Sequence, residues 1–355
     1  MGRGAASLTS QTLVIQTAFL GDVILTTPLL SAIAQHHGPV DVVTTPIAAP
    51  LLETHPAVGQ VIPYDKRRTD HGWEGLRRLA RRLKAGRYEH VYLPHRSLRT
   101  AALARLARIP SRIGFSGPWS FLYTEARPKP RSGHESDRLL ALAQEPPATY
   151  RPHLRPTAED ERVAAALVHG DFVALAPGSI WGSKRWPYYA ELAAKLGKRV
   201  TIVVVGGTDD VQFGDEIGRA VEQAGGQAVN ACGQLTLRQS AALIGRATAL
   251  VTNDSAPLHL ATAMGTPVVA LFGPTVTEFG FGPLRAGDLA LGVAGLLCRP
   301  CSAHGPPQCP LVHHRCMRDL AVAAVTRAVE DLGALRRGRC RWWIEPDILL
   351  VLSRR

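Results

Sequence analysis

Residues 249–272 read ALVTNDSAPLHLATAMGTPVVALF, and this stretch decides the expected fold. The apolar runs at residues 249–252 and 268–272 predict two strands, and residues 256–264 between them predict a helix. Strands joined by helices of this length pair in parallel and are covered on both faces. Ligands of such sheets bind beyond the carboxyl ends of the strands. The polar residues 253–255, which follow the first strand, are therefore candidate site residues.

The same alternation of strands and helices recurs on both sides of this stretch. Further strands are predicted at residues 13–17, 40–44, 58–62, 88–93, 172–176 and 200–205, and further helices at residues 187–196, 211–224 and 237–245. A helical stretch also runs to His36 with Pro28 inside it, so we expect an irregular first turn there. This alternation predicts an α/β protein with two Rossmann-like parallel-sheet domains that face each other across a cleft.

The boundary between the domains is expected at a proline-rich stretch. A chain of 355 residues exceeds the usual size of one domain, and prolines recur through residues 144–162. We expect a first domain at residues 1–150, an interdomain linker at residues 151–170 and a second domain at residues 171–335. The tail, residues 336–355, either packs back on the first domain or forms an ill-ordered extension.

The net charge of +12 comes from one part of the chain. Residues 66–138 hold 18 Lys and Arg against 6 Asp and Glu, and the remainder is balanced. Within them, residues 73–84 predict an amphipathic helix with a strongly basic exterior. Such a field attracts nucleic acid, phospholipid headgroups or a phosphorylated glycolipid, and a set of solvated helix faces is the alternative. No apolar run reaches the roughly 18 residues that span a bilayer, so we expect a cytoplasmic protein.

Four of the six cysteines are clustered late in the chain, at Cys298, Cys301, Cys309 and Cys316. In a reducing cytoplasm such a cluster indicates a structural metal site or packed free thiols before a disulfide framework. The first spacing is that of a zinc knuckle, whereas the remaining spacings are uneven. Both interpretations stay open, and in neither do we expect the cysteines to carry the chemistry.

Polar clusters follow several of the predicted strands. They are Gly21-Asp22, Pro177-Gly178-Ser179 with Lys184, Gly206 to Asp210, and Asn253 to His259. Backbone amides at a helix start hold phosphate groups, and a lysine adds a mobile positive charge. The second and fourth clusters therefore predict a diphosphate ligand, although Asp254 or Ser255 at a helix start has a simple N-cap role as its alternative.

Taken together, the motifs resemble the lipopolysaccharide heptosyltransferases, glycosyltransferase family 9. They are GDVILTTP at residues 21–28, PGS at 177–179 with KRWP at 184–187, TNDSAPLHLA at 252–261 and GTPVVALFGPT at 265–275. The cysteine stretch that ends in HHRCM at residues 313–317 is similar to the second heptosyltransferases of the inner core. The resemblance covers roughly residues 13–328, and the number and order of the motifs distinguish it from a chance match.

The resemblance implies an inverting GT-B glycosyltransferase without a cofactor. It places an ADP-heptose donor in the second domain and a lipid A-linked inner-core acceptor in the first. The basic excess of residues 66–138 is expected to hold the phosphorylated core of this acceptor and to bring the enzyme into peripheral contact with the inner face of the cytoplasmic membrane. Asp22 matches the catalytic base of the family. Implied donor-binding residues are Gly178, Ser179, Lys184, Leu235, Asp254, Ser255 and His259. Two departures are Ile180-Trp181, where some members carry small polar residues, and the tail after Arg336, which has no counterpart.

The chemistry of the residues agrees with this interpretation. Inversion at an anomeric carbon needs a carboxylate to take the acceptor's proton and a cation to stabilise the departing diphosphate. Asp22 and Lys184 supply these two groups, and an N-cap role is the alternative for Asp22. No Asp-x-Asp pair follows a strand, so we expect a metal-independent reaction. Lys66, Arg67 and Arg68 follow a predicted strand and are expected to bind the acceptor.

Three other functions compete with this one. A nicotinamide dehydrogenase needs three glycines in G-x-G-x-x-G after its first strand, and here only Gly21 follows. A nucleic-acid-binding protein would explain the basic stretch, but stacking aromatics are sparse there and the phosphate clusters would have no role. We therefore expect no nucleic-acid partner. The nearer alternative is a transferase of the same family with a different nucleotide sugar or glycan acceptor.

Overall fold

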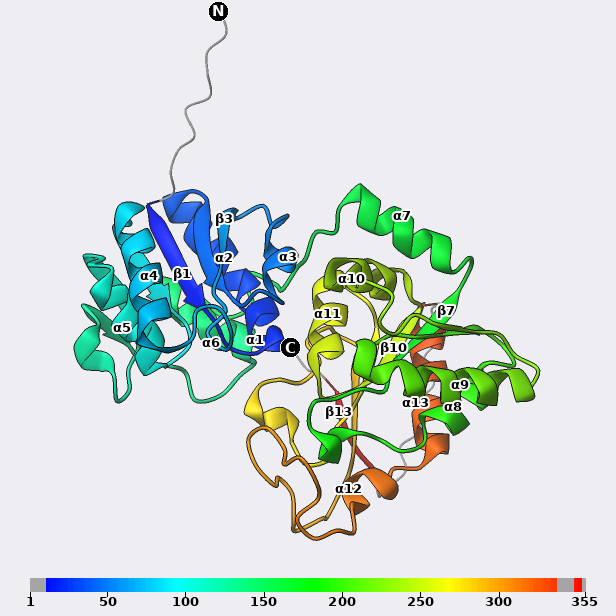
Figure 1. Cartoon of the computed structure of the whole chain (residues 1–355). Coiled ribbons are helices and arrows are strands. Elements are labelled where there is room, and N and C mark those ends of the chain that lie inside the picture. Colours follow the sequence, from blue (N-terminus) through cyan, green and yellow to red (C-terminus); the bar gives the residue numbers. More distant parts are fainter. Residues whose placement is uncertain (1–10, 337–347, 353–355) are drawn as a thin grey trace, which may run out of the picture. The chain divides into compact units, whose positions relative to one another are not determined.

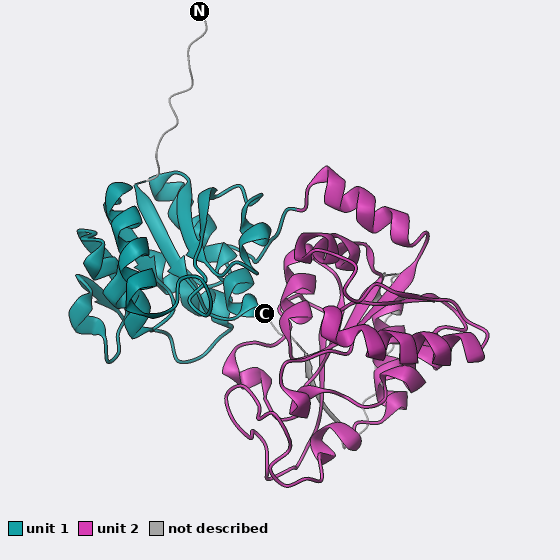
Figure 2. Ribbon diagram, viewed as in Figure 1, with its two compact units in different colours: residues 1–155 teal, residues 156–355 magenta. Residues whose placement is uncertain are grey.

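The computed structural model describes residues 11–336 and 348–352 (Figure 1). The chain divides into two compact units, Met1–Arg155 and Pro156–Arg355 (Figure 2). Each unit is built on one sheet with helices packed on it. The division falls at the end of the proline-rich stretch.

The first unit contains a six-stranded sheet in which every neighbouring pair is parallel. In the order β3-β2-β1-β4-β5-β6, the strands are β3 Val58–Pro63, β2 Val40–Thr44, β1 Thr12–Gln16, β4 His90–Leu93, β5 Ser111–Phe115 and β6 Glu125–Arg127. The whole of β1 is buried, as a central strand between two helical layers requires. The chain leaves β1 on one side and returns to β4 on the other. The carboxyl ends of β1 and β4 therefore flank the position where such sheets bind ligands.

Helices cover both faces of this sheet because successive strand residues point to opposite sides. On β1, Leu13 and Ile15 pack in one cluster with α4 and α5, whereas Val14 packs in another with α2. The helices are α1 Leu20–Leu25, α2 Thr27–His37, α3 Ala49–Leu52, α4 Gly72–Ala85, α5 Leu98–Leu106 and α6 Glu135–Leu140.

Two local predictions for the first unit are confirmed. The irregular turn expected near Pro28 is a break between α1 and α2 at Thr26, and Pro28 occupies the first turn of α2. The basic amphipathic helix is α4, which buries Leu76, Leu79, Ala80 and Leu83 and exposes Arg77, Arg78, Arg81, Arg82 and Lys84.

The second unit contains a seven-stranded sheet. In the order β13-β12-β11-β10-β7-β8-β9, the strands are β13 Ile348–Leu352, β12 Leu289–Val293, β11 Val268–Leu271, β10 Ala249–Asn253, β7 Phe172–Ala176, β8 Thr201–Val204 and β9 Ala228–Asn230. All pairs are parallel except β12 with β13. The chain leaves β7 towards β8 and β9 and returns to β10 on the other side. The carboxyl ends of β7 and β10 form the ligand-binding position of this sheet.

The second unit also has helices beside its strands. They are α7 Ala158–Leu167, α8 Tyr189–Leu196, α9 Val211–Gln223, α10 Leu237–Arg246, α11 Ala256–Met264, α12 Arg315–Arg318 and α13 Val322–Arg336. Three 3-10 turns lie near the carboxyl ends of strands, namely η3 Gly182–Lys184, η4 Thr208–Asp210 and η5 Thr277–Phe279.

Two segments differ from their expected roles. Residues 151–170, expected as a linker, contain α7, which packs against α10 and joins it through a 2.6 Å contact from Arg238 Nε to Asp160 Oδ2. The described part of the tail, residues 348–352, is a strand of the second unit. It forms β13 and pairs with β12, whose unpaired backbone groups offer a partner to another strand. The rest of the tail, residues 337–347 and 353–355, lies outside the described residues.

The α/β class with two Rossmann-like parallel-sheet units is confirmed by this topology. Of the helices that the structure describes, none is both long enough and apolar enough to cross a bilayer.

Candidate active site

In the first unit, the loop after β1 carries Asp22. Gln16, the last residue of β1, is buried and donates from Nε2 to Thr26 Oγ1 at 3.0 Å. The Gln16 carbonyl oxygen Oε1 accepts from the Ala18 amide at 3.3 Å, and Thr26 Oγ1 donates to the Asp22 carbonyl at 2.7 Å. These contacts hold the loop and α1 at the end of the central strand, and so place Asp22 at the ligand-binding edge of the sheet.

The Asp22 carboxylate caps the start of α1, in which Asp22 is the third residue. It is half-buried, and its Oδ2 accepts from the Phe19 amide, three residues earlier, at 3.2 Å. An acidic side chain in this position satisfies an amide at the helix start. The capping role weighed for Asp22 is thus present in the structure. Its role as a base stays a prediction.

The three residues predicted to bind the acceptor differ in their surroundings. Lys66 is half-buried and donates from Nζ to the Thr17 carbonyl at 2.6 Å, so it reaches the loop that carries Asp22. Burial lowers the pKa of Lys66, and the positive charges of Arg67 and Arg99 lower it further. Arg67 and Arg68 are exposed, and their backbone amides donate to Asp65 Oδ1 at 3.2 and 3.1 Å. The structure therefore brings only Lys66 of the three against the Asp22 loop.

Further basic residues lie near Lys66 at this edge, and sequence reasoning missed them. His95 follows β4; burial lowers its pKa, and the positive charges of Lys66, Lys129 and Arg96 add to that effect. Arg99 donates from Nη1 to the Tyr64 hydroxyl at 3.2 Å. His95 and Arg96 follow a strand that was predicted, so the strand-end rule that selected Lys66 would also have found them.

In the second unit, a buried asparagine ties together the loops around the site. Asn253 ends β10, and its Nδ2 donates to the Pro177 carbonyl at 2.8 Å. Its Oδ1 accepts from the Trp186 amide and from the Tyr189 hydroxyl, both at 3.2 Å. This single side chain therefore joins the end of β10 to the loop after β7 and to the start of α8. The sequence indicated Asn253 as a candidate site residue, but not this role in joining the loops.

The loop after β7 approaches an acidic side chain so closely that a larger residue at position 178 would displace that side chain. A Cβ on Gly178 would lie 2.4 Å from the carboxylate oxygens of Asp210, well inside contact distance. Asp210 Oδ2 accepts from the Gly207 amide at 3.0 Å, which holds the carboxylate in this position. Gly178 thus brings the loops after β7 and β8 together.

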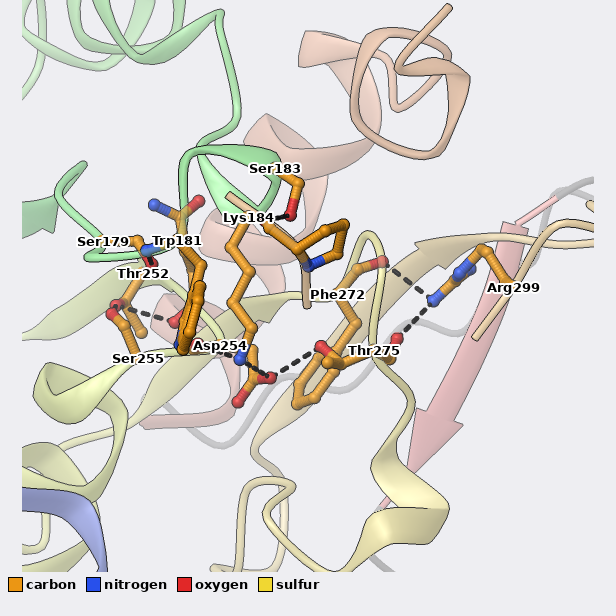
Figure 3. Close-up of polar contacts among 12 residues, drawn as sticks. Ser179, Trp181, Ser183, Lys184, Thr252, Asp254, Ser255, Phe272, Thr275 and Arg299 are labelled. Carbon is orange, nitrogen blue, oxygen red and sulfur yellow. Dashed lines mark hydrogen bonds and ion pairs between the residues drawn. The ribbon is translucent and has the colours of Figure 1, made fainter. Parts of the chain in front are cut away.

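The main charged group of this unit is the pair of Lys184 and Asp254 (Figure 3). Lys184 Nζ donates to Asp254 Oδ2 at 2.6 Å and to the Asp254 carbonyl at 3.1 Å. Thr275 Oγ1 donates to the same Oδ2 at 2.6 Å. Lys184 and Asp254 are only 7% and 8% exposed. An ammonium group has three N–H donors, and the contacts with described residues use two of them.

The start of α11 lies beside this pair. Ser255 is its N-cap residue, yet its side chain makes no capping hydrogen bond to the helix. The hydroxyl lies 3.5 Å from the Gly178 carbonyl and from Thr252 Oγ1. A plain N-cap role for Ser255 is therefore not what this structure shows, and the positive end of the helix dipole is available to an anion.

Comparison with known proteins agrees with this geometry. Residues 76–307 match Glycosyltransferase family 9 (heptosyltransferase). The chain belongs to this family. It is 29% identical to lipopolysaccharide heptosyltransferase 2 of Salmonella typhimurium, over 79% of this chain and 92% of that protein. It is 30% identical to lipooligosaccharide heptosyltransferase 2 of Haemophilus influenzae, over 75% of this chain and 84% of that protein.

A solved structure extends the similarity to the fold. The ADP-heptose lipopolysaccharide heptosyltransferase II of E. coli superimposes with a TM-score of 0.74 at 26% identity, over 92% of this chain and 99% of that one. The predicted GT-B fold class is thereby confirmed. As a member of the family, the protein is a glycosyltransferase.

The remaining predicted donor residues of this glycosyltransferase lie at the same edge of the second sheet. Ser179 Oγ accepts from the Trp181 amide at 3.2 Å. Leu235 is half-buried in the loop between β9 and α10. This loop passes close to the loop after β8, since a Cβ built on Gly233 would lie 3.2 Å from Thr208 Cα. His259 is buried in α11 and packs edge-on against Phe281, with ring centroids 6.2 Å apart. His259 is thus packed within the second unit, and its role in donor binding stays a prediction.

The cysteines of this glycosyltransferase are free thiols wherever the structure describes them, and Cys340 lies outside that part. Within the described residues, no three His, Cys, Asp or Glu side chains gather as a metal-ligand set. Burial raises the pKa of the Cys316 thiol to about 11, so this thiol stays protonated at neutral pH. We refer to residues 298–316 as the cysteine segment.

Proposed function

We propose that the protein transfers heptose from ADP-heptose to the lipid A-linked inner core of lipopolysaccharide, with inversion and without a metal ion. The relatives named above support the donor and the acceptor class, since their names specify lipopolysaccharide and ADP-heptose. The observation that carries the proposal is the buried Lys184–Asp254 pair beside the uncapped start of α11.

The second unit is proposed to hold the donor diphosphate. The third N–H of Lys184 and the amides at the start of α11 would donate to the phosphate oxygens. Both described contacts to the Asp254 carboxylate fall on Oδ2. Its Oδ1 is therefore proposed to accept a hydroxyl of the sugar. Ser179, Gly178 and Ser255 are proposed to border the diphosphate, with Leu235 beside the nucleobase and His259 supporting the helix from within.

The first unit is proposed to hold the acceptor and to supply the base. Asp22 takes the proton of the acceptor hydroxyl while the oxygen of that hydroxyl attacks the anomeric carbon. The bond from that carbon to the diphosphate oxygen breaks in the same step. Negative charge then grows on the leaving ADP, where Lys184 stabilises it. Lys66 and the cations around it are proposed to bind phosphate groups of the acceptor core. The exposed arginines of α4 are proposed to favour the anionic inner face of the cytoplasmic membrane.

A second candidate is transfer of a different sugar by the same site. Ile180, beside Ser179, is 75% exposed, and Trp181 follows it, where some family members have small polar residues. A changed rim of this kind can alter which sugar hydroxyls are recognised.

A screen of nucleotide sugars distinguishes the two candidates. The purified protein is incubated with a lipid A-linked inner-core acceptor and ADP-heptose, UDP-glucose, UDP-N-acetylglucosamine or GDP-mannose, and release of the nucleotide is measured. Acceptor-dependent release of ADP from ADP-heptose alone supports the proposal. Release from another donor in its place assigns the chain to the second candidate. Chelator is added in parallel, and loss of turnover that an added divalent cation restores would contradict metal independence.

A further inference from the structure

The cysteine segment contacts the loop that follows β11. Arg299 donates from Nη2 to the carbonyls of Phe272 and Thr275, both at 3.0 Å, and from Nη1 to the Val293 carbonyl at 2.6 Å (Figure 3). The Cys301 amide donates to the Pro274 carbonyl at 2.8 Å. Thr275, whose hydroxyl contacts Asp254, is thus held by its own carbonyl to Arg299. One end of the segment therefore supports the Asp254 side of the pair.

The other end of the same segment contacts the turn that carries Lys184. The Ser183 amide donates to the Pro307 carbonyl at 3.2 Å, and the Ser183 hydroxyl donates to the Pro306 carbonyl. His314 Nε2 lies 2.7 Å from the Ser183 carbonyl. Because a carbonyl oxygen only accepts, Nε2 carries the hydrogen in this contact. These bonds fix η3 from three positions of the segment.

The segment also covers the lysine side chain itself. Gly305 has a positive φ of 79°, and a Cβ built on it would lie 3.2 Å from Lys184 Cε and 3.2 Å from Pro274 Cγ. The backbone at residue 305 therefore lies over the stem of Lys184. This close approach helps to explain why a lysine so near the ligand-binding edge is only 7% exposed.

We propose that the cysteine segment orients the Lys184 side chain so that its third N–H points to the donor diphosphate. His314 and Arg299 are the positioning residues of the segment. A lysine side chain is flexible and its ammonium rotates, so its direction depends on what holds its stem and its partners. The segment holds the turn of Lys184 through His314 and the loop of Thr275 through Arg299. This inference rests on the proposed binding of the diphosphate by Lys184 and adds the residues that orient it.

The test compares His314→Ala with His314→Gln, because the glutamine amide is also an N–H donor. ADP affinity is measured by calorimetry, together with the thermal midpoint and the KM for donor and acceptor. We expect His314→Ala to weaken ADP binding about threefold to tenfold, the effect of one hydrogen bond, and His314→Gln to recover most of it. The acceptor KM should not change. His313→Ala is the matched control, since His313 Nδ1 accepts from the Arg315 amide within the segment.

A double-mutant cycle with Lys184→Ala separates positioning from general support. If His314 acts through the lysine, His314→Ala should have little further effect on ADP affinity once Lys184 is alanine. An undiminished effect in that background would overturn the inference, as would unchanged ADP binding by His314→Ala or by Lys184→Ala. If UDP or GDP binds instead of ADP, the donor assignment is wrong. The double-mutant cycle is then measured with the diphosphate that binds, and the same outcomes test the role of His314. If no nucleoside diphosphate binds the wild-type protein, the proposed function fails as well.

Discussion

Two lysines, one in each unit, lie at the ligand-binding edge of a parallel sheet and have opposite surroundings. Lys184 contacts a carboxylate at 2.6 Å, whereas Lys66 contacts a backbone carbonyl at 2.6 Å and feels the positive charges of Arg67 and Arg99. The charge of Lys184 is balanced and oriented before any ligand arrives. The charge of Lys66 lies among like charges, and an anionic ligand would reduce the repulsion between them. This difference is in line with the proposal that the second unit holds one defined diphosphate and the first a larger phosphorylated molecule.

The largest effect is expected from Asp22→Asn, which asks whether the chemistry depends on the first unit. Asparagine keeps an oxygen that accepts from the Phe19 amide, so the helix cap survives. It cannot take a proton, and general-base catalysis is typically worth about 10²–10⁴-fold in rate. We expect turnover to fall at least about a hundredfold while the thermal midpoint and ADP affinity stay unchanged. Turnover near the wild-type rate would show that capping is the whole role of Asp22.

Removing Lys184 should affect both binding and stability, because its partner is buried. Lys184→Ala is expected to weaken ADP binding by about 10–100-fold, the value of a charge-assisted contact of about 1.5–3 kcal/mol. It should also lower the free energy of unfolding, since the buried Asp254 carboxyl loses its charged partner.

The double variant Lys184→Ala with Asp254→Asn separates these two effects. Asparagine removes the buried charge, so we expect the stability to recover while ADP affinity stays low. Urea unfolding and calorimetry on the same samples measure both quantities. Recovery of ADP affinity in the double variant would mean that Lys184 only neutralises Asp254 and does not touch the diphosphate.

Acceptor binding should distinguish Lys66 from its two exposed neighbours. We expect Lys66→Met to raise the KM for the acceptor more than Arg67→Met or Arg68→Met, because Lys66 is half-buried against the Asp22 loop. The smaller effects of the two arginines should vanish as salt is raised, since exposed charges are screened. None of the three variants should change the donor KM. A donor KM that rose together with the acceptor KM would contradict the assignment of these residues to the acceptor.

Local pattern was enough to predict the elements that lie at the centre of each sheet. The buried apolar runs of β2 and β7 and the helix α11 have the bounds that the sequence predicts. The strands farther from the centre were missed, namely β5, β6, β9, β12 and β13. Of these, β6 and β9 have only three residues each, too few to show a hydrophobic period, and their pairing with neighbours is what makes them strands.

The site divides in the same way between local and long-range information. Lys184 and Asp254 were selected singly, because each follows a strand and lies near a helix start. Their pairing joins residues 70 positions apart, and the hydrogen bond from Thr275 completes it from a third loop. No local sequence pattern predicts the role of Arg299, because its partners are backbone carbonyls, which every type of residue supplies. Such contacts become visible only when the loops are placed in space.

The smallest effect concerns the pH dependence of stability near Lys66. Because burial and like charges lower its pKa from 10.5 in the folded protein, the unfolded chain binds more protons between the lowered pKa and 10.5. The contribution of Lys66 to stability therefore rises with pH across that window. Neither Lys66→Met nor Lys66→Arg titrates there, so both variants should lack this rise. Urea unfolding between neutral pH and 10.5 measures it as the difference from wild type. Equal slopes in all three proteins would mean that the Lys66 charge is already balanced, which would remove the contrast with Lys184.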